Sequence, residues 1–247
     1  NQMKKILYVV LTIVISPLVI SQPIVSIESL RHSGEIGVFK SAGISFDGSR
    51  GNEERDEYEF NLSYTKNNEN LESLFTFNKS ERAKDNKIEG ESLFFHARFL
   101  LKSDKKYNFE AYIQSSENPF QSYKKRDLLG FGLRFDAPNQ YKIGLSLLQE
   151  KEESLLSINK STERLNLYLY KEVLLQNTNY LSTSLFYQPS LNKFSSDYKA
   201  SFLISLNMPI SDKFIIELRF ANVMDNDPPD ISDKSNQSFS TNFRYKF

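Results

Sequence analysis

Apolar and polar residues alternate along most of this chain, most plainly in its C-terminal segment QSFSTNFRYKF. Phe239, Phe243, Tyr245 and Phe247 share one phase of the alternation, while serine, asparagine, arginine and lysine fill the other. Because successive side chains of a β-strand point to opposite faces, a period of two predicts a strand whose faces meet different surroundings. The apolar face must therefore lie against either a protein core or hydrocarbon.

The same alternation recurs about twelve times, which predicts an all-β chain of about twelve strands. With a residue or two added at either end, most segments reach the ~9–11 residues of a strand that crosses a bilayer. The apolar phases fall within residues 42–46, 58–64, 71–77, 93–101, 109–113, 129–135, 141–147, 165–169, 181–187, 200–206, 214–220 and 239–247.

Charged residues occupy the polar phase in the middle of many of these segments. Stripping water from an ion is costly even after the surroundings relax, so these side chains cannot line a dry core without partners. The polar face must be wet or densely salt-bridged, and we expect it to be the lumen of a barrel. The lumen-facing charged candidates are Arg98, Glu110, Arg134, Lys142, Arg164, Glu217, Arg219 and Arg244.

Short and long connections alternate between the expected strands. The short ones, such as residues 66–68 and 137–139, consist of turn-forming residue types. Alternation of short periplasmic turns with longer outer loops is typical of an outer-membrane barrel. We therefore expect a single up-and-down antiparallel transmembrane β-barrel with both ends of the mature chain in the periplasm. The expected long loops cover residues 47–55, 82–89, 117–125, 150–161, 189–197 and 225–234.

Aromatic residues gather at the ends of the expected strands, and two aromatic belts at the two membrane surfaces are typical of such barrels. The belt expected at the short turns comprises Tyr64, Tyr107, Phe135, Tyr141, Tyr180, Phe214 and Phe247. The belt expected near the long loops comprises Phe46, Tyr58, Phe77, Tyr123, Tyr187 and Phe220.

The N-terminal segment differs from the rest. Lys4 and Lys5 precede an apolar run at residues 6–20, which predicts a signal peptide over residues 1–21 and export through the inner membrane. A short membrane anchor is the alternative, although the run is shorter than the ~20 residues of a spanning helix. We expect a periplasmic segment at residues 22–35 and the barrel at residues 36–247.

Bulk composition narrows the set of partners. The 31 basic and 31 acidic side chains cancel, so no long-range attraction to nucleic acid is expected. Cysteine is absent, which excludes disulfides, a cysteine nucleophile and a cysteine-ligated metal. The remaining expected partners are outer-membrane lipid and small solutes.

The histidines give little support for catalysis. His32 precedes the first expected strand, and His96 lies on the inward phase near Arg98. A lipid-modifying enzyme would need a serine and a histidine on the lipid face near the outer rim, so His96 points the wrong way. We expect no catalytic residue and no cofactor.

A calcium site in the last long loop is a weak alternative. Its four aspartates could supply the oxygen ligands that calcium prefers. However, Pro228 and Pro229 interrupt the run, and the glycine-centred spacing of a calcium loop is missing, so we expect no bound metal. The aspartates are Asp225, Asp227, Asp230 and Asp233.

The inward phase also indicates a narrow lumen. A barrel of about twelve strands is intermediate between eight, which side chains fill, and sixteen, which leave a water channel. Opposite charges could cross-link and plug the interior, and Gly130 and Gly132 suit close packing of lumen side chains or a strand bend. Apolar inward residues point the same way, and they are Leu74, Phe94, Leu100, Leu148, Tyr168, Tyr170, Leu203 and Ile215.

Several stretches resemble the salt-induced outer-membrane protein family, DUF481-type β-barrels of unknown function. The most telling is NDPPDISDKSNQSFSTNFRYKF, preceded by SLFYQPSLNKFSSDYKASFLISLNMPISDKF. Weaker pieces are EFNLSYTKNNENLESLFTF and NFEAYIQSSENPFQSYKKRDLLGFGLRF. The resemblance implies a link to salt or osmotic response and transfers no catalytic residue. The ending at Phe243, Tyr245 and Phe247 also resembles the C-terminal signal that engages the barrel-assembly machinery.

Three functions follow as hypotheses. The first is a non-enzymatic outer-membrane protein, structural or stress-adaptive, with at most narrow permeability. The second is a porin or transporter for small solutes, and the third is a lipid-modifying enzyme.

Overall fold

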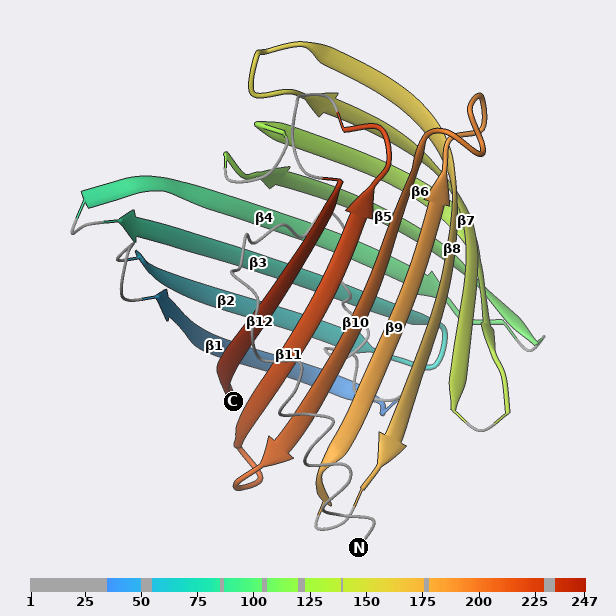
Figure 1. Cartoon of the computed structure of the whole chain (residues 1–247). Helices are drawn as coiled ribbons and strands as arrows, with labels where there is room; N and C mark the ends of the chain where they lie inside the picture. Colours follow the sequence, from blue (N-terminus) through green and yellow to red (C-terminus); the bar gives the residue numbers. More distant parts are fainter. Residues whose placement is uncertain are drawn as a thin grey trace, which may run out of the picture.

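Antiparallel pairing runs around the sheet without a break. The computed structural model describes residues 35–49, 55–84, 87–103, 106–119, 123–138, 140–175, 178–228 and 234–247. Twelve strands pair with their sequence neighbours, and β1 pairs with β12 to close a barrel (Figure 1). The expected up-and-down antiparallel barrel of about twelve strands is confirmed. The strands are β1 (Gly37–Ser49), β2 (Arg55–Asn67), β3 (Leu71–Lys84), β4 (Lys87–Leu101), β5 (Tyr107–Glu117), β6 (Lys125–Asp136), β7 (Tyr141–Glu153), β8 (Asn159–Leu174), β9 (Tyr180–Pro189), β10 (Tyr198–Pro209), β11 (Phe214–Asp225) and β12 (Ser235–Lys246).

The seam between β1 and β12 closes the cylinder. Its register runs from Ser41 opposite Lys246 to Phe46 opposite Thr241. The backbone N–H of Phe247 extends the seam by donating to the carbonyl of Lys40 at 3.0 Å. Hydrocarbon offers no hydrogen-bonding partner, so only a closed sheet can leave no edge exposed to it.

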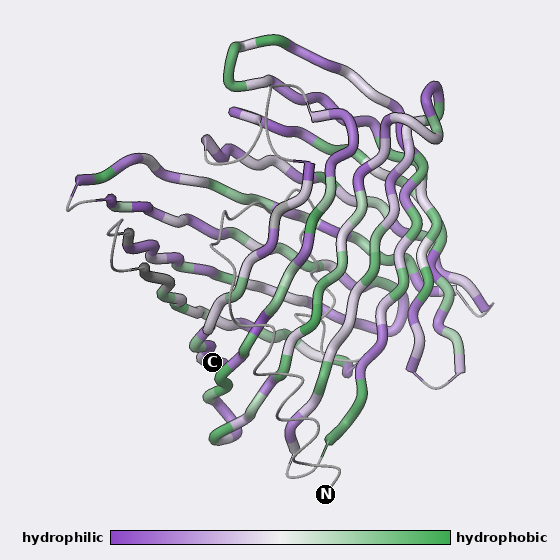
Figure 2. Tube along the Cα trace, viewed as in Figure 1, coloured by the Kyte–Doolittle hydropathy of each residue, from purple (hydrophilic) through white to green (hydrophobic). Residues whose placement is uncertain are grey.

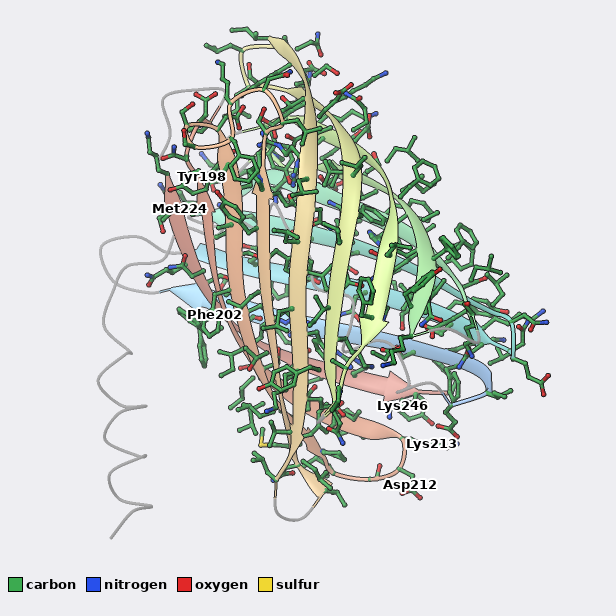
Figure 3. All side chains as sticks on the ribbon, turned by 90° about the vertical axis from the view of Figure 1, so that its right-hand side faces the viewer. Tyr198, Phe202, Asp212, Lys213, Met224 and Lys246 are labelled. Atoms are coloured by element: carbon green, nitrogen blue, oxygen red, sulfur yellow. The ribbon has the colours of Figure 1, made fainter. Side chains whose placement is uncertain are left out.

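The short turns and the expected long loops lie at opposite rims, as their alternation along the chain predicted. The short turns lie at the rim where the chain ends, and the N–H of Lys246 donates to the carbonyl of Lys213 at 2.8 Å. Figure 3 shows Asp212, Lys213 and Lys246 at this short-turn rim, with Tyr198 towards the opposite, long-loop rim. The expected signal peptide and residues 22–34 lie outside the described residues, within which no helix is long and apolar enough to span a bilayer.

Three expected long loops are wrong in extent. Of residues 47–55, the described ones belong to strands, because the β1–β2 ladder reaches Ser49 opposite Arg55. Of residues 82–89, the described ones belong to strands, because the β3–β4 ladder continues to the pair Lys84 and Lys87 after a register shift between Arg82 and Ala83. The ladder of β7 and β8 likewise reaches Glu153 opposite Asn159, so most of the expected loop at residues 150–161 is also strand. Polar side chains on both faces suggested a loop, but they also suit a two-stranded ribbon in water. Figure 1 shows the β3–β4 hairpin reaching beyond its neighbours at the left.

The outer face of the barrel carries the apolar phase. Phe131 in the middle of β6 is 60% exposed, and its cross-strand neighbour Leu147 is 58% exposed. Figure 2 shows hydrophobic and hydrophilic residues alternating along the strands. A sheet with this much exposed apolar surface is stable only in contact with hydrocarbon, so the outward phase forms the lipid face.

Aromatic pairs occur at both ends of the strands. Tyr107 and Phe135 lie 6.2 Å apart between ring centroids near the short turns, and Phe46 and Tyr58 lie 5.6 Å apart near the long loops. Two expected belt residues are misplaced. Tyr123 is buried, and its hydroxyl lies 3.2 Å from Ser116 Oγ inside the barrel.

Tyr180 is the second misplaced residue. It shares the inward phase of β9 with the buried Ser182 and Ser184, and it faces the charges of Glu217 and Arg244. Position at a strand end placed both tyrosines near a membrane surface, but strand phase and the path of the loop decided which side of the wall they face.

Candidate functional site: the barrel lumen

The structure places the eight lumen-facing charged candidates on the inward phase of their strands, but not in one site. Six are buried, namely Arg98, Glu110, Arg134, Arg164, Glu217 and Arg244. Lys142 and Arg219 are partly exposed. Lys142 Nζ lies 5.6 Å from the ring centroid of Tyr170, and Arg134 Nε lies 3.4 Å from Asp136 Oδ1. The others belong to three separate clusters.

The largest cluster lies towards the long-loop rim, and we call it the charged plug. Its centre is Glu150, which accepts hydrogen bonds from Arg126 Nε and Arg164 Nε, both at 2.5 Å. Glu150 is 2% exposed, so its carboxylate is almost completely removed from water. The charged plug comprises Arg126, Glu150, Glu152, Arg164, Asp197, Lys199 and Asp225.

Within the charged plug, Lys199 on β10 connects the glutamates of β7 with Asp225 on β11. Its ammonium lies 2.5 Å from Glu152 Oε2, 3.2 Å from Glu150 Oε1 and 3.2 Å from Asp225 Oδ2. Lys199 is 1% exposed. Buried ions are stable only when partners replace their water, and each cation here has at least two carboxylates nearby.

Sequence reasoning missed most of the charged plug. Of the seven residues of the charged plug, only Arg164 was predicted to face the lumen. Glu150 and Asp197 were assigned to loops. A signal was present: Leu148, Glu150 and Glu152 continue one inward phase of β7 without interruption. The run of charged residues at the end of β7 obscured this alternation.

The rim above the charged plug is also tied by ion pairs. Lys160 Nζ lies 3.0 Å from Asp197 Oδ2 and 2.9 Å from Asp227 Oδ2. The hydrogen bond from Lys160 lowers the pKa of Asp227, which lies beyond the end of β11. The aspartates considered for calcium therefore have lysine partners where they are described, since Asp225 contacts Lys199. Asp230 and Asp233 lie outside the described residues.

A second cluster, the tyrosine bridge, connects strands that are not neighbours. It consists of Arg98 on β4, Glu110 on β5 and Tyr168 on β8. The Tyr168 hydroxyl donates to Glu110 Oε2 at 2.9 Å and accepts from Arg98 Nη2 at 2.5 Å. Arg98 also forms an ion pair with Glu110. This bridge crosses the interior and narrows it between the charged plug and the short-turn rim.

Glycines make room for the rings at the tyrosine bridge. A Cβ atom on Gly144 would lie 1.8 Å from Tyr168 Cε1, and one on Gly130 would lie 2.1 Å from Tyr112 Cζ. The interpretation of the Gly130 to Gly132 stretch as a site of close lumen packing is therefore confirmed. Tyr112 continues the packing, because its hydroxyl lies 3.0 Å from Ser146 Oγ.

The third cluster surrounds Glu217 near the closing strand. Its carboxylate accepts from Arg219 Nη2 at 3.1 Å and from Arg244 Nη2 at 3.0 Å. Asn242 Nδ2 donates to the same group at 3.3 Å. These contacts join the inner faces of β11 and β12, and β12 also forms the seam with β1.

The space left by these clusters lies against β1 to β5, β11 and β12, and we call it the mouth cavity. It measures about 110 Å³ and lies on the long-loop side of the tyrosine bridge. Inward side chains dominate its wall: Ser45, Glu57, Glu59, Asn78, Ser80, Ser92, Phe94, Ser116, Asn118, Tyr123, Arg219, Ser238 and Ser240. The lumen is thus packed on one side and retains a small polar space on the other.

His96 lies inside the packed lumen rather than on the lipid face. Its ring stacks between Phe94 and Tyr112, with centroid distances of 6.3 and 5.9 Å. Its Nδ1 lies 3.3 Å from Gln114 Oε1. This environment holds the imidazole as a structural element and keeps it away from a substrate on the outer surface. His32 lies outside the described residues.

The lipid face carries an apolar groove of about 640 Å³ across β7 to β11. Leu167, Leu185, Ala200 and Phe202 contribute to it. Figure 3 shows Phe202 on this outer face. Its lining suits contact with acyl chains.

A family model described as "Protein of unknown function, DUF481" matches residues 42–247, which is nearly the whole barrel. The chain belongs to the DUF481 family. None of the curated proteins matches this DUF481 member.

Several solved structures match this chain over most of its length. The KdgM porin has 9% identity and a TM-score of 0.49, with 85% of this chain and 99% of that chain covered. The COG4313 outer membrane channel from Pseudomonas putida F1 has 10% identity and a TM-score of 0.49, with 86% and 95% covered. The translocator domain of the autotransporter NalP from Neisseria meningitidis has 11% identity and a TM-score of 0.46, with 85% and 87% covered. At these identities the likeness concerns the barrel fold alone.

Removing the central charge of the plug should destabilise the barrel. Glu150→Gln leaves Arg126, Arg164 and Lys199 buried with one carboxylate fewer, so we expect the free energy of unfolding to fall by about 3–5 kcal/mol. Equilibrium urea unfolding in lipid vesicles measures this loss.

Glu153→Gln is the matched control on the same strand. Its partner Lys124 is solvent-exposed, so the urea midpoint should hardly move. Equal midpoint shifts for the two variants would show that the charged plug is not a stabilising centre.

Proposed function

We propose that this DUF481 protein is a non-enzymatic outer-membrane barrel whose narrow lumen passes only ions and small polar solutes. One observation carries the proposal: the tyrosine bridge crosses the interior beside a mouth cavity of about 110 Å³. A lumen with this packing is too constricted for a general porin. The stacked, buried position of His96 supports a role without catalysis.

The outer membrane is the proposed location, with the apolar outer face in contact with lipid. A closed barrel with an apolar outer phase is the only sheet architecture that hydrocarbon tolerates. The signal peptide expected at residues 1–21 would carry the chain through the inner membrane.

Permeability is tested by single-channel recording in planar bilayers. The intact protein should give small, stable conductance steps, because water and ions can pass only beside the packed clusters. Tyr168→Ala removes the ring and both hydrogen bonds of the tyrosine bridge, so we expect the conductance to rise at least about twofold, as a wider lumen implies.

Tyr187→Ala is the control for that experiment, because Tyr187 is an aromatic residue on the outward phase of the same wall. Its conductance should equal that of the unchanged protein. Absence of any step above the protein-free baseline would reject permeability and leave a purely structural role.

We further propose that the C-terminal strand engages the barrel-assembly machinery through Phe243, Tyr245 and Phe247. Phe243 and Tyr245 lie on the outward phase of β12, Phe247 follows the last residue of that strand, and the rings of Tyr245 and Phe247 are 5.1 Å apart. Phe247→Ser should reduce the heat-modifiable, folded form in outer-membrane fractions several-fold.

Leu101→Ser provides the comparison, because Leu101 is 53% exposed on the outward phase at the end of β4, and Phe247 is 75% exposed. Both residues lie at the short-turn rim, so both variants remove a mostly exposed apolar side chain there. If both variants assemble equally well, the terminal aromatic residue carries no assembly signal.

A role in salt or osmotic adaptation completes the proposal, and the resemblance to salt-induced barrels supports it. A deletion strain of the source bacterium should grow more slowly than its parent at raised NaCl concentration and equally well in dilute medium. Restoring the gene should restore growth. Identical growth of the two strains at every salt concentration would remove this role.

A further inference from the structure

The mouth cavity has a wall rich in hydroxyl and amide groups. Six serines from five strands face it, together with two asparagines and the Tyr123 hydroxyl. Each hydroxyl can donate and accept a hydrogen bond, and each amide has separate donor and acceptor atoms. The serines are Ser45, Ser80, Ser92, Ser116, Ser238 and Ser240, and the asparagines are Asn78 and Asn118.

Two of the three charges in the wall, those of Glu57 and Arg219, are paired within the protein, and the third, Glu59, faces Arg219 but also the carboxylates of Glu57 and Glu217. Glu57 accepts from Arg82 Nη2 at 3.0 Å and Nε at 3.3 Å. Arg219 lies 3.1 Å from Glu217 and also faces Glu59. A charged solute would therefore meet few uncompensated opposite charges while losing its own water, which is costly. The other hydrogen-bonding groups of the wall, from serine, asparagine and tyrosine side chains, are uncharged.

Aromatic side chains complete the wall. Phe94 lies parallel to His96, at an interplanar angle of 8°, which holds its ring in place. Tyr123 is buried and anchored by its contact with Ser116. A polyhydroxylated molecule has C–H edges as well as hydroxyl groups, so it can contact such rings while it exchanges hydrogen bonds with serines.

The volume limits the size of the occupant. One water molecule needs about 10–15 Å³ of such space, so the 110 Å³ of the mouth cavity hold roughly seven to eleven non-hydrogen atoms. A four- or five-carbon polyol has this size. The cavity also lies on the long-loop side of the tyrosine bridge, where a solute entering from outside would arrive first.

We propose that the mouth cavity is a binding site for a small, neutral, polyhydroxylated solute. The inference rests on the proposed function, because it names the class of solute that a narrow lumen would admit. Serine and asparagine groups recognise the hydroxyls of the solute, and Phe94 and Tyr123 contact its carbon edges.

Saturation-transfer NMR on the folded barrel in detergent tests binding without requiring conduction. Erythritol is the probe, and glycine betaine, which has the same number of non-hydrogen atoms but no hydroxyl group, is the comparison solute. We expect a saturable signal for erythritol and none for glycine betaine. Equal signals for both solutes would overturn the proposal.

A double variant locates the site. Ser80 and Ser92 form a hydroxyl pair at 2.6 Å in the cavity wall, and replacing both with alanine should weaken erythritol binding about tenfold. Ser41 and Ser63 form an equally short pair of 2.6 Å outside the cavity, so their double alanine variant is the matched control and should bind normally. Unchanged erythritol binding in the Ser80→Ala, Ser92→Ala protein would also overturn the proposal.

The result is separable from the test of permeability. Conductance steps without erythritol binding would leave the narrow channel standing and reject the polyol site. Erythritol binding without conductance would support the site and reject the channel.

Discussion

Backbone hydrogen bonding around a closed ring is the constraint on which the rest of the structure depends. A strand edge left open in hydrocarbon would expose unpaired amide and carbonyl groups, each at a cost of several kcal/mol. The seam between β1 and β12 removes that edge. Closure also divides the side chains into an outer set that meets lipid and an inner set that must share one enclosed volume.

The enclosed volume explains why so many charges are buried. Inward positions of twelve strands face each other across a short distance, so a lysine on one strand can reach a glutamate several strands away. Glu150 and Lys199 illustrate this, since each contacts groups from at least two other strands. The ions stabilise each other only as a group, and loss of one carboxylate leaves its partners without compensation.

Packing of the lumen links stability to function. Gly130 and Gly144 allow tyrosine rings to lie flat against the wall, and the ring of Tyr168 then reaches Arg98 and Glu110 across the interior. The same contacts that fill the barrel restrict passage through it. Under the proposed function, a solute that passes must fit beside them, through a space lined mainly by serine, asparagine and glutamate side chains.

Much of this fold could be predicted from the sequence, because alternation with period two is a local property. It determined the strand positions, the apolar outer phase and the inward direction of Arg98, Glu110 and Glu217. The contacts among inward residues could not be predicted, because they depend on register and on the curvature that brings non-neighbouring strands together. Sequence reasoning therefore found Arg164 but missed Glu150 and Lys199. By itself the sequence determined which side of the wall most residues face; only closure of the barrel decided which of them meet inside, because that distance is set by the whole ring and not by any one strand.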